Sequence, residues 1–181
     1  MRRMGWLCTT AAICLLMVGN AGAAPTAQMK EALVAGGFTH AQGSDSGNLN
    51  LDLSLGYYMT PGWQVGFRQA LNYNFIDDHR DDWRATTAPF LNYNYAVTDI
   101  IVPYVGGFLG LTWNDRDASG TIGPQAGIKF FVHDAAFLNL GYRYEIFFNN
   151  FKAVDNSSDD GFHVFNIGIG LTWGGSGTRK P

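Results

Sequence analysis

The stretch NLNLDLSLGY at residues 48–57 alternates strictly between polar or small residues and large apolar ones. Alternate side chains of a β-strand point to opposite faces, so a strand here has one face of leucines and a tyrosine and one polar face. An amphipathic helix would repeat every 3.6 residues, and this stretch does not. The stretch therefore predicts a strand whose two faces lie in different surroundings.

The same period of two continues along the chain on both sides of this stretch. One further run precedes it, at about 32–40, and six follow it, at about 63–75, 84–97, 101–113, 122–130, 138–148 and 165–173. Short turn signals at 60–62, 98–99 and 133–135 alternate with longer polar segments at 41–47, 76–82, 114–120 and 149–160. This arrangement predicts an all-β fold, an eight-stranded antiparallel up-and-down β-barrel with both termini at the turn end.

Three prolines fall inside these runs. Pro89, Pro103 and Pro124 cannot donate a hydrogen bond to a strand ladder. We therefore expect bulges or strand ends at these positions.

The polarity of the predicted barrel indicates a membrane. Charged residues make up only 15% of the chain, against roughly 25% in soluble proteins. A soluble lipocalin-like barrel would have aliphatic side chains inside and charges outside. Here the ionisable strand residues lie on the polar face, opposite the aliphatic one, and we expect them to form a polar network in the lumen: Asp52, Arg68, Arg84, Lys129, Arg143 and Glu145. The sequence therefore predicts a transmembrane barrel.

Aromatic residues gather near both ends of the apolar face. Two aromatic girdles that flank an aliphatic band fit a bilayer with two interfaces. The expected girdles are Tyr57, Trp63, Tyr95 and Trp173 at the turn end, and Tyr73, Trp83, Trp113 and Phe148 at the loop end.

The N-terminal segment, residues 1–23, has the form of a secretory signal peptide. Arg2 and Arg3 precede an apolar run at 7–18, and Ala21-Gly22-Ala23 fits a cleavage site. Its removal would take away both cysteines of the chain. We expect a barrel domain at 24–173, a short tail at 174–181, and export to the outer membrane of a Gram-negative bacterium.

Residues 123–132, a tight turn and residues 138–144 (GPQAGIKFFV and LNLGYRY) carry a family resemblance. This hairpin resembles the small eight-stranded outer-membrane barrels of the opacity and outer-membrane-protein-A type. There a G-x-K-Y-F strand precedes one that ends in E-Y-R-Y; here Phe130 and Gly141 replace the tyrosine and the glutamate. We expect a monomeric barrel and, because the sequence stops at Pro181, no periplasmic peptidoglycan-binding domain.

The resemblance also implies a structural or surface-interaction role through the loops. The expected partners are outer-membrane lipid, lipopolysaccharide and an unidentified surface ligand. The formal charge of −3 and the lack of a basic run exclude a nucleic-acid partner.

Two other functions stay open. The polar network either plugs the lumen or lines a passive small-solute channel, which four cations against two carboxylates would bias weakly towards anions. Some barrels of this size are lipid A-modifying enzymes, but His40, His79, His133 and His163 are scattered, and no serine follows His163 at the required spacing. We therefore expect no catalytic, cofactor or metal site.

Acidic segments mark three of the predicted loops. Asp77 to Asp82, Asp115 to Asp117 and Asp155 to Asp160 could bind divalent cations or bridge to lipopolysaccharide phosphates. None of them has the spacing of a known calcium loop. We interpret them as solvated loops.

Overall fold

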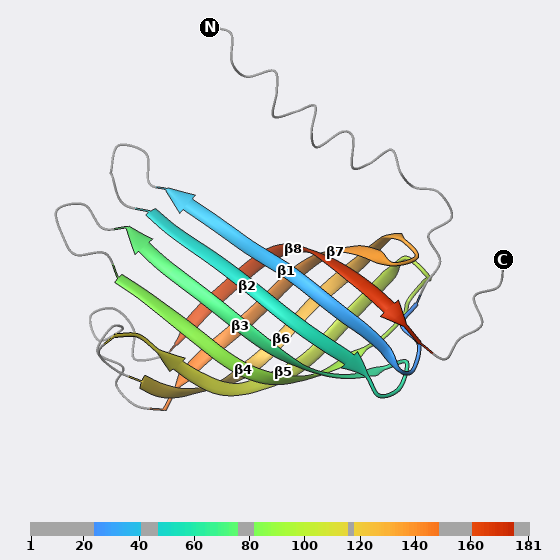
Figure 1. Cartoon of the computed structure of the whole chain (residues 1–181), viewed down its shortest axis with the longest axis horizontal. Coiled ribbons are helices and arrows are strands. Elements are labelled where there is room, and N and C mark those ends of the chain that lie inside the picture. The colour runs from blue at the N-terminus through green and yellow to red at the C-terminus, as the bar shows by residue number, and fades with distance from the viewer. Residues whose placement is uncertain (1–23, 41–46, 76–81, 116–117, 149–160, 176–181) are drawn as a thin grey trace, which may run out of the picture.

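One closed antiparallel barrel makes up the computed structural model, which describes residues 24–40, 47–75, 82–115, 118–148 and 161–175 (Figure 1). Its eight strands are β1 (Met29–His40), β2 (Gly47–Tyr58), β3 (Trp63–Phe75), β4 (Asp82–Asn94), β5 (Ile101–Trp113), β6 (Ala118–His133), β7 (Ala136–Phe147) and β8 (Phe162–Gly174). Each strand pairs with the next along the chain, and β8 pairs with β1. The predicted eight-stranded up-and-down barrel is confirmed.

Closure between the first and last strands removes the sheet edges. The β1–β8 ladder runs from Met29↔Gly174 to Gly36↔Ile167, so the backbones of the first and last strands are paired along this stretch. The short connections 59–62, 95–100 and 134–135 lie at one end, with the start of β1 and the finish of β8 (right in Figure 1). We call this the turn end and the opposite end the loop end. The described residues contain no helix long and apolar enough to span a membrane.

The two faces of the barrel wall differ sharply in polarity. Outward side chains are large and apolar, such as Leu53 at 47% and Ile167 at 67% exposure, whereas the inward neighbour Asp52 is 3% exposed. The strands are 12–16 residues long, and about 9–11 residues suffice for a tilted strand to cross the hydrocarbon core. The barrel is therefore long enough and apolar enough outside to span a bilayer.

The prolines were expected to mark bulges or strand ends. No bulge occurs at any of the three, and Pro89 and Pro124 lie inside β4 and β6, so the prediction is wrong for these two; Pro103 is the third residue of β5 and lies close to a strand end. The offset between paired residues is the same on both sides of each proline, and within the described ladders the register shifts only between Phe131 and His133. Each proline has a register partner on one neighbouring strand only: Pro89 with Phe67, Pro103 with Ile128 and Pro124 with Gly107. A proline lacks a donor but inserts no residue, so the ladder loses a bond on one side and keeps its register.

An apolar groove of about 920 Å³ crosses the outer face of β4, β5 and β6. Gly107 lies in it without a side chain, beside Pro124, Leu91 and Leu109. The lining is almost wholly apolar, so the groove belongs to the outer surface and is chemically distinct from the polar lumen.

Two glycines on adjacent strands are expected to differ in their sensitivity to substitution by alanine. A Cβ at Gly123, on the inner side, would lie 1.7 Å from the carbonyl oxygen of Tyr144, whereas a Cβ at Gly107, on the outer side, would meet only the Gly123 carbonyl oxygen at 3.4 Å. Gly123→Ala should therefore lower the free energy of unfolding by about 1–3 kcal/mol, and Gly107→Ala should change it by less than about 0.5 kcal/mol. Urea unfolding in lipid vesicles measures both values, and equal losses would contradict this placement of the two faces.

Candidate functional site

The strongest concentration of polar groups lies inside the barrel. All six residues that the sequence places on the polar face point into the lumen, and Asp52, Lys129, Arg143 and Glu145 are each at most 3% exposed. Arg68 and Arg84 are partly buried. The six residues come from five different strands, because each strand contributes every second side chain to the interior.

The sequence analysis missed one charged member of the lumen, Glu31. The first strand was expected to begin at about Ala32, but it begins at Met29, and Glu31 is only 4% exposed. The signal was weak because the glycines and alanines of this run give little contrast between its faces. With Glu31 included, three described lumenal carboxylates face four cations, so the predicted surplus of two positive charges is reduced to one.

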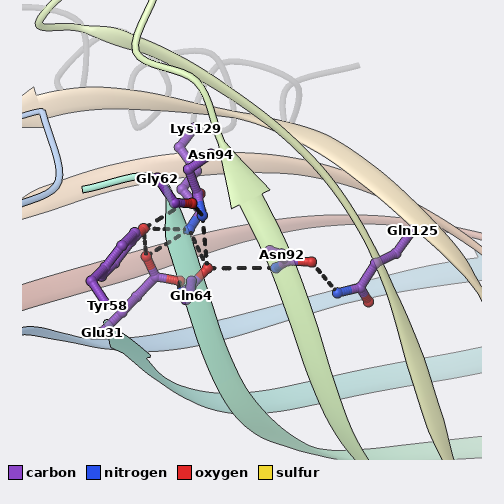
Figure 2. A network of polar contacts seen from close by, with 8 residues as sticks. All are labelled: Glu31, Tyr58, Gly62, Gln64, Asn92, Asn94, Gln125 and Lys129. Carbon is purple, nitrogen blue, oxygen red and sulfur yellow. Dashed lines mark hydrogen bonds and ion pairs between the residues drawn. The ribbon is translucent and has the colours of Figure 1, made fainter. Parts of the chain in front are cut away.

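Lys129 is the centre of a network near the turn end, which we call the turn-side layer (Figure 2). Its ammonium donates to Glu31 Oε2 at 2.7 Å, to Tyr58 Oη at 2.8 Å and to Gln64 Oε1 at 3.2 Å. An ammonium has three protons, so all three donors are used. Asn94 Nδ2 also donates to Gln64 Oε1, at 3.4 Å. The layer consists of Glu31, Tyr58, Gln64, Asn94 and Lys129.

The Glu31 carboxylate is equally well satisfied. Besides Lys129 it accepts from the Tyr58 hydroxyl at 2.8 Å and from Gln64 Nε2 at 2.9 Å. These partners come from β2, β3 and β6, so the contacts of Glu31 on β1 cross the lumen. A buried ion pair with this many hydrogen bonds leaves no charge uncompensated.

A chain of amides leads from this layer towards the middle of the barrel. Asn92 Nδ2 donates to Gln64 Oε1 at 3.5 Å, and Gln125 Nε2 donates to Asn92 Oδ1 at 2.5 Å (Figure 2). Gln125 Oε1 in turn accepts from Arg68 Nη2. The chain therefore connects the turn-side layer to a central arginine.

A second set of ion pairs, the loop-side layer, crosses the lumen nearer the loop end. Arg143 donates through Nε to Glu145 Oε1 at 2.6 Å and through Nη1 to Asp52 Oδ2 at 2.5 Å. Asn166 Nδ2 also donates to Asp52 Oδ2, at 3.1 Å. Arg84 Nη2 lies 4.0 Å from Glu145 Oε2. The layer consists of Asp52, Arg84, Arg143, Glu145 and Asn166, and it links β2, β4, β7 and β8.

The expected girdle residues lie on the outer face. Trp63 packs edge-on against Tyr93 with ring centroids 5.1 Å apart, and Trp83 packs edge-on against Trp113 at 5.5 Å. Tyr73 and Trp83 are partly buried, whereas the other six are more than 40% exposed: Tyr57, Trp63, Tyr95, Trp113, Phe148 and Trp173. Their position at bilayer interfaces stays a prediction.

The described residues do not bring histidines together with the groups that catalysis or metal binding would need. His163 lies on the outer face, where Nδ1 and the Tyr142 hydroxyl are 2.8 Å apart. Within the described ranges, no three His, Cys, Asp or Glu side chains gather around a point that could hold a metal ion. The acidic loops at 77–81 and 155–160, together with His79, lie outside the described residues.

A closed antiparallel barrel with an apolar exterior and an ion-paired interior defines the class of transmembrane up-and-down β-barrels. The model of the outer membrane protein beta-barrel domain matches residues 11–172, and the chain belongs to this family.

Solved structures share the fold at low sequence identity. The outer membrane protein OprG from Pseudomonas aeruginosa is 14% identical, with a TM-score of 0.54 over 82% of this chain and 97% of OprG. Neisserial surface protein A is 17% identical, with a TM-score of 0.55 over 80% of this chain and 93% of its own. A search of curated protein sequences finds no match.

Proposed function

We propose that this protein is an integral outer-membrane barrel, exported by its N-terminal signal peptide, whose lumen is closed to ions. Its role is structural or surface interaction through its loops, with lipid and lipopolysaccharide as its immediate surroundings. The observation that carries the closed lumen is the pair of ionic layers that cross the interior from wall to wall.

The energetics of the two layers support closure. An eight-stranded barrel has an interior just wide enough for side chains to fill. The shortest ion pair of each layer, Arg143–Asp52 at 2.5 Å in the loop-side layer and Lys129–Glu31 at 2.7 Å in the turn-side layer, joins side chains that are nearly inaccessible. An ion that passed either point would have to separate a buried pair and leave charges uncompensated, which is costly.

Two alternative functions draw on specific residues. The surplus positive charge of the lumen would favour a weakly anion-preferring channel if the layers opened. A lipid A-modifying enzyme would need an activated nucleophile beside a base. In the part of the chain that the structure describes, His163 makes its side-chain hydrogen bond with a tyrosine rather than with a serine or carboxylate.

Removing one ion pair from each layer is expected to open the barrel, whereas removing one pair alone is not. The two layers lie in series, so Glu31→Ala with Lys129→Ala leaves the loop-side layer closed, and Asp52→Ala with Arg143→Ala leaves the turn-side layer closed. The fourfold variant should show a steady current in planar bilayers, whereas the wild type and both double variants should show little.

Each double variant removes equal positive and negative charge, so it is a matched control for changes in net charge. Heat-modifiable migration on gels and the β signal in circular dichroism would verify folding of every variant. A large, stable current from the wild-type protein would contradict the closed lumen and favour the channel.

A further inference from the structure

A small polar cavity lies between the two ionic layers. Its volume is about 30 Å³, and its lining includes Asp52, Ser54, Arg68, Gln125 and Asn139. Glu31 and Lys129 border it towards the turn end, and Arg143 borders it towards the loop end. The cavity is therefore enclosed by the same groups that close the lumen.

Arg68 brings an unbalanced charge to this cavity. Its guanidinium donates to Gln125 Oε1 and lies 5.6 Å and 5.5 Å from the ring centres of Phe90 and Phe108. In the described structure no carboxylate forms an ion pair with it, in contrast to the other three lumenal cations. A guanidinium has five donors, so a neutral amide and two rings leave hydrogen-bonding capacity unused.

Two buried acceptor oxygens on the wall of the same cavity lack a hydrogen-bond donor from the protein. Asp52 Oδ1 and Asn139 Oδ1 have no protein partner, although both residues are at most 3% exposed. Their other polar atoms are engaged: Asp52 Oδ2 accepts from Arg143 and Asn166, and Asn139 Nδ2 donates to Asn166. Buried polar atoms without any partner are rare, because each costs its desolvation free energy.

The strand register brings these groups near one another on one face. Arg68 of β3 is directly opposite Ser54 of β2, and Asp52 lies two residues from Ser54 on the same inward face. Such diagonal neighbours are about 7–8 Å apart between their Cα atoms. Arg68 is turned towards Gln125 on β6, so no direct bond joins it to Asp52.

We infer that the central cavity holds ordered water that bridges the Arg68 guanidinium to Asp52 Oδ1 and Asn139 Oδ1. One water molecule needs about 10–15 Å³ of space open to its centre, so this cavity holds about two. Each water can accept from Arg68 and donate to one of the two oxygens. The pair Arg68–Asp52 is then a water-mediated ion pair.

Charged ligands fit the cavity less well than water. A halide beside Arg68 would face the unpaired carboxylate oxygen of Asp52. A metal cation at Asp52 would face the positive charges of Arg68, Lys129 and Arg143. Water alone serves both the donors and the acceptors. The inference rests on the proposed closed lumen in one respect, because only an enclosed chamber keeps its water from rapid exchange.

A high-resolution crystal structure of the mature protein grown in sodium bromide tests the identity of the ligand. We expect water density within hydrogen-bond distance of Arg68 and of Asp52 Oδ1, with no anomalous bromide signal in the cavity. A bromide peak there, or a direct Arg68–Asp52 contact without water, would overturn the inference.

Substitution of Ser54 tests the enclosure with a matched control at the same position. Ser54→Val adds bulk to the cavity wall and should abolish the water density, whereas Ser54→Ala leaves the space open and should keep it. Oxygen-17 relaxation dispersion in micelles should show correspondingly fewer long-lived waters in Ser54→Val than in Ser54→Ala. Equal water in the two variants would contradict the site.

The closed lumen and the water site can fail separately. Bridging water in the crystal together with a large wild-type current would overturn only the closed lumen. A bilayer without current, together with a cavity that holds bromide or no water, would overturn only the water site.

Discussion

Lys129→Met is expected to lower the free energy of unfolding by about 3–5 kcal/mol, the typical cost of removing one partner of a buried ion pair. Glu31 would stay only 4% exposed and would keep the neutral donors Tyr58 and Gln64 but lose its cation. Methionine nearly preserves the volume of the lysine stem, so the loss reports the charge rather than a cavity. Urea unfolding in lipid vesicles, followed by tryptophan fluorescence, measures it.

The double variant Glu31→Gln with Lys129→Met separates the two causes of that loss. It removes both charges together, and replacement of a whole buried pair by neutral groups is often close to neutral. Most of the stability should therefore return. Lys30→Met, at an exposed position one residue from Glu31, controls for lysine removal at the surface and should change stability by less than about 0.5 kcal/mol. Equal losses in the single and double variants would mean that the pair is not the source of the stability.

Leu53→Arg is expected to destabilise the protein in a bilayer by about 2–4 kcal/mol, the cost of an arginine on the lipid face near the midplane. Leu53 lies near the middle of β2, is 47% exposed, and has apolar outward neighbours at Leu51 and Leu55. The guanidinium there would have to enter hydrocarbon or pull water and headgroups towards it. Unfolding titrations of the protein in phospholipid vesicles measure the change.

Met59→Arg is the matched control for depth. Met59 follows the last residue of β2 at the turn end and is 49% exposed, so an arginine there can reach the headgroups and should cost roughly 0–1 kcal/mol. The difference between the two substitutions measures the depth of Leu53. Equal costs at both positions would show that the outer face of β2 does not contact hydrocarbon at its centre.

The alternation of residue types by itself determined the number of strands, their approximate limits and the face on which each side chain lies. A strand has a strict period of two, so the leucines at 49–55 and the polar residues between them separate without knowledge of any neighbour. The same rule placed Asp52 and Arg143 inside. It failed at the start of β1, where small residues hide the contrast between faces and Glu31 went unnoticed. Prolines were overinterpreted as bulges, because a proline removes one hydrogen bond from the ladder on one side without inserting a residue.

Only the closed tertiary structure decided which charges meet. Lys129 and Glu31 are 98 residues apart in the chain, and Arg143 and Asp52 are 91 apart. Their contacts depend on the stagger between strands and on the pairing of β1 with β8. Together these place the partner side chains of opposite walls at the same level along the barrel axis. The partner of an inward side chain is set by this three-dimensional offset, whereas its inward direction is set locally by the pleat. The separation into two ionic layers, with Arg68 and a cavity between them, follows from the same offset and therefore has no counterpart in the linear pattern.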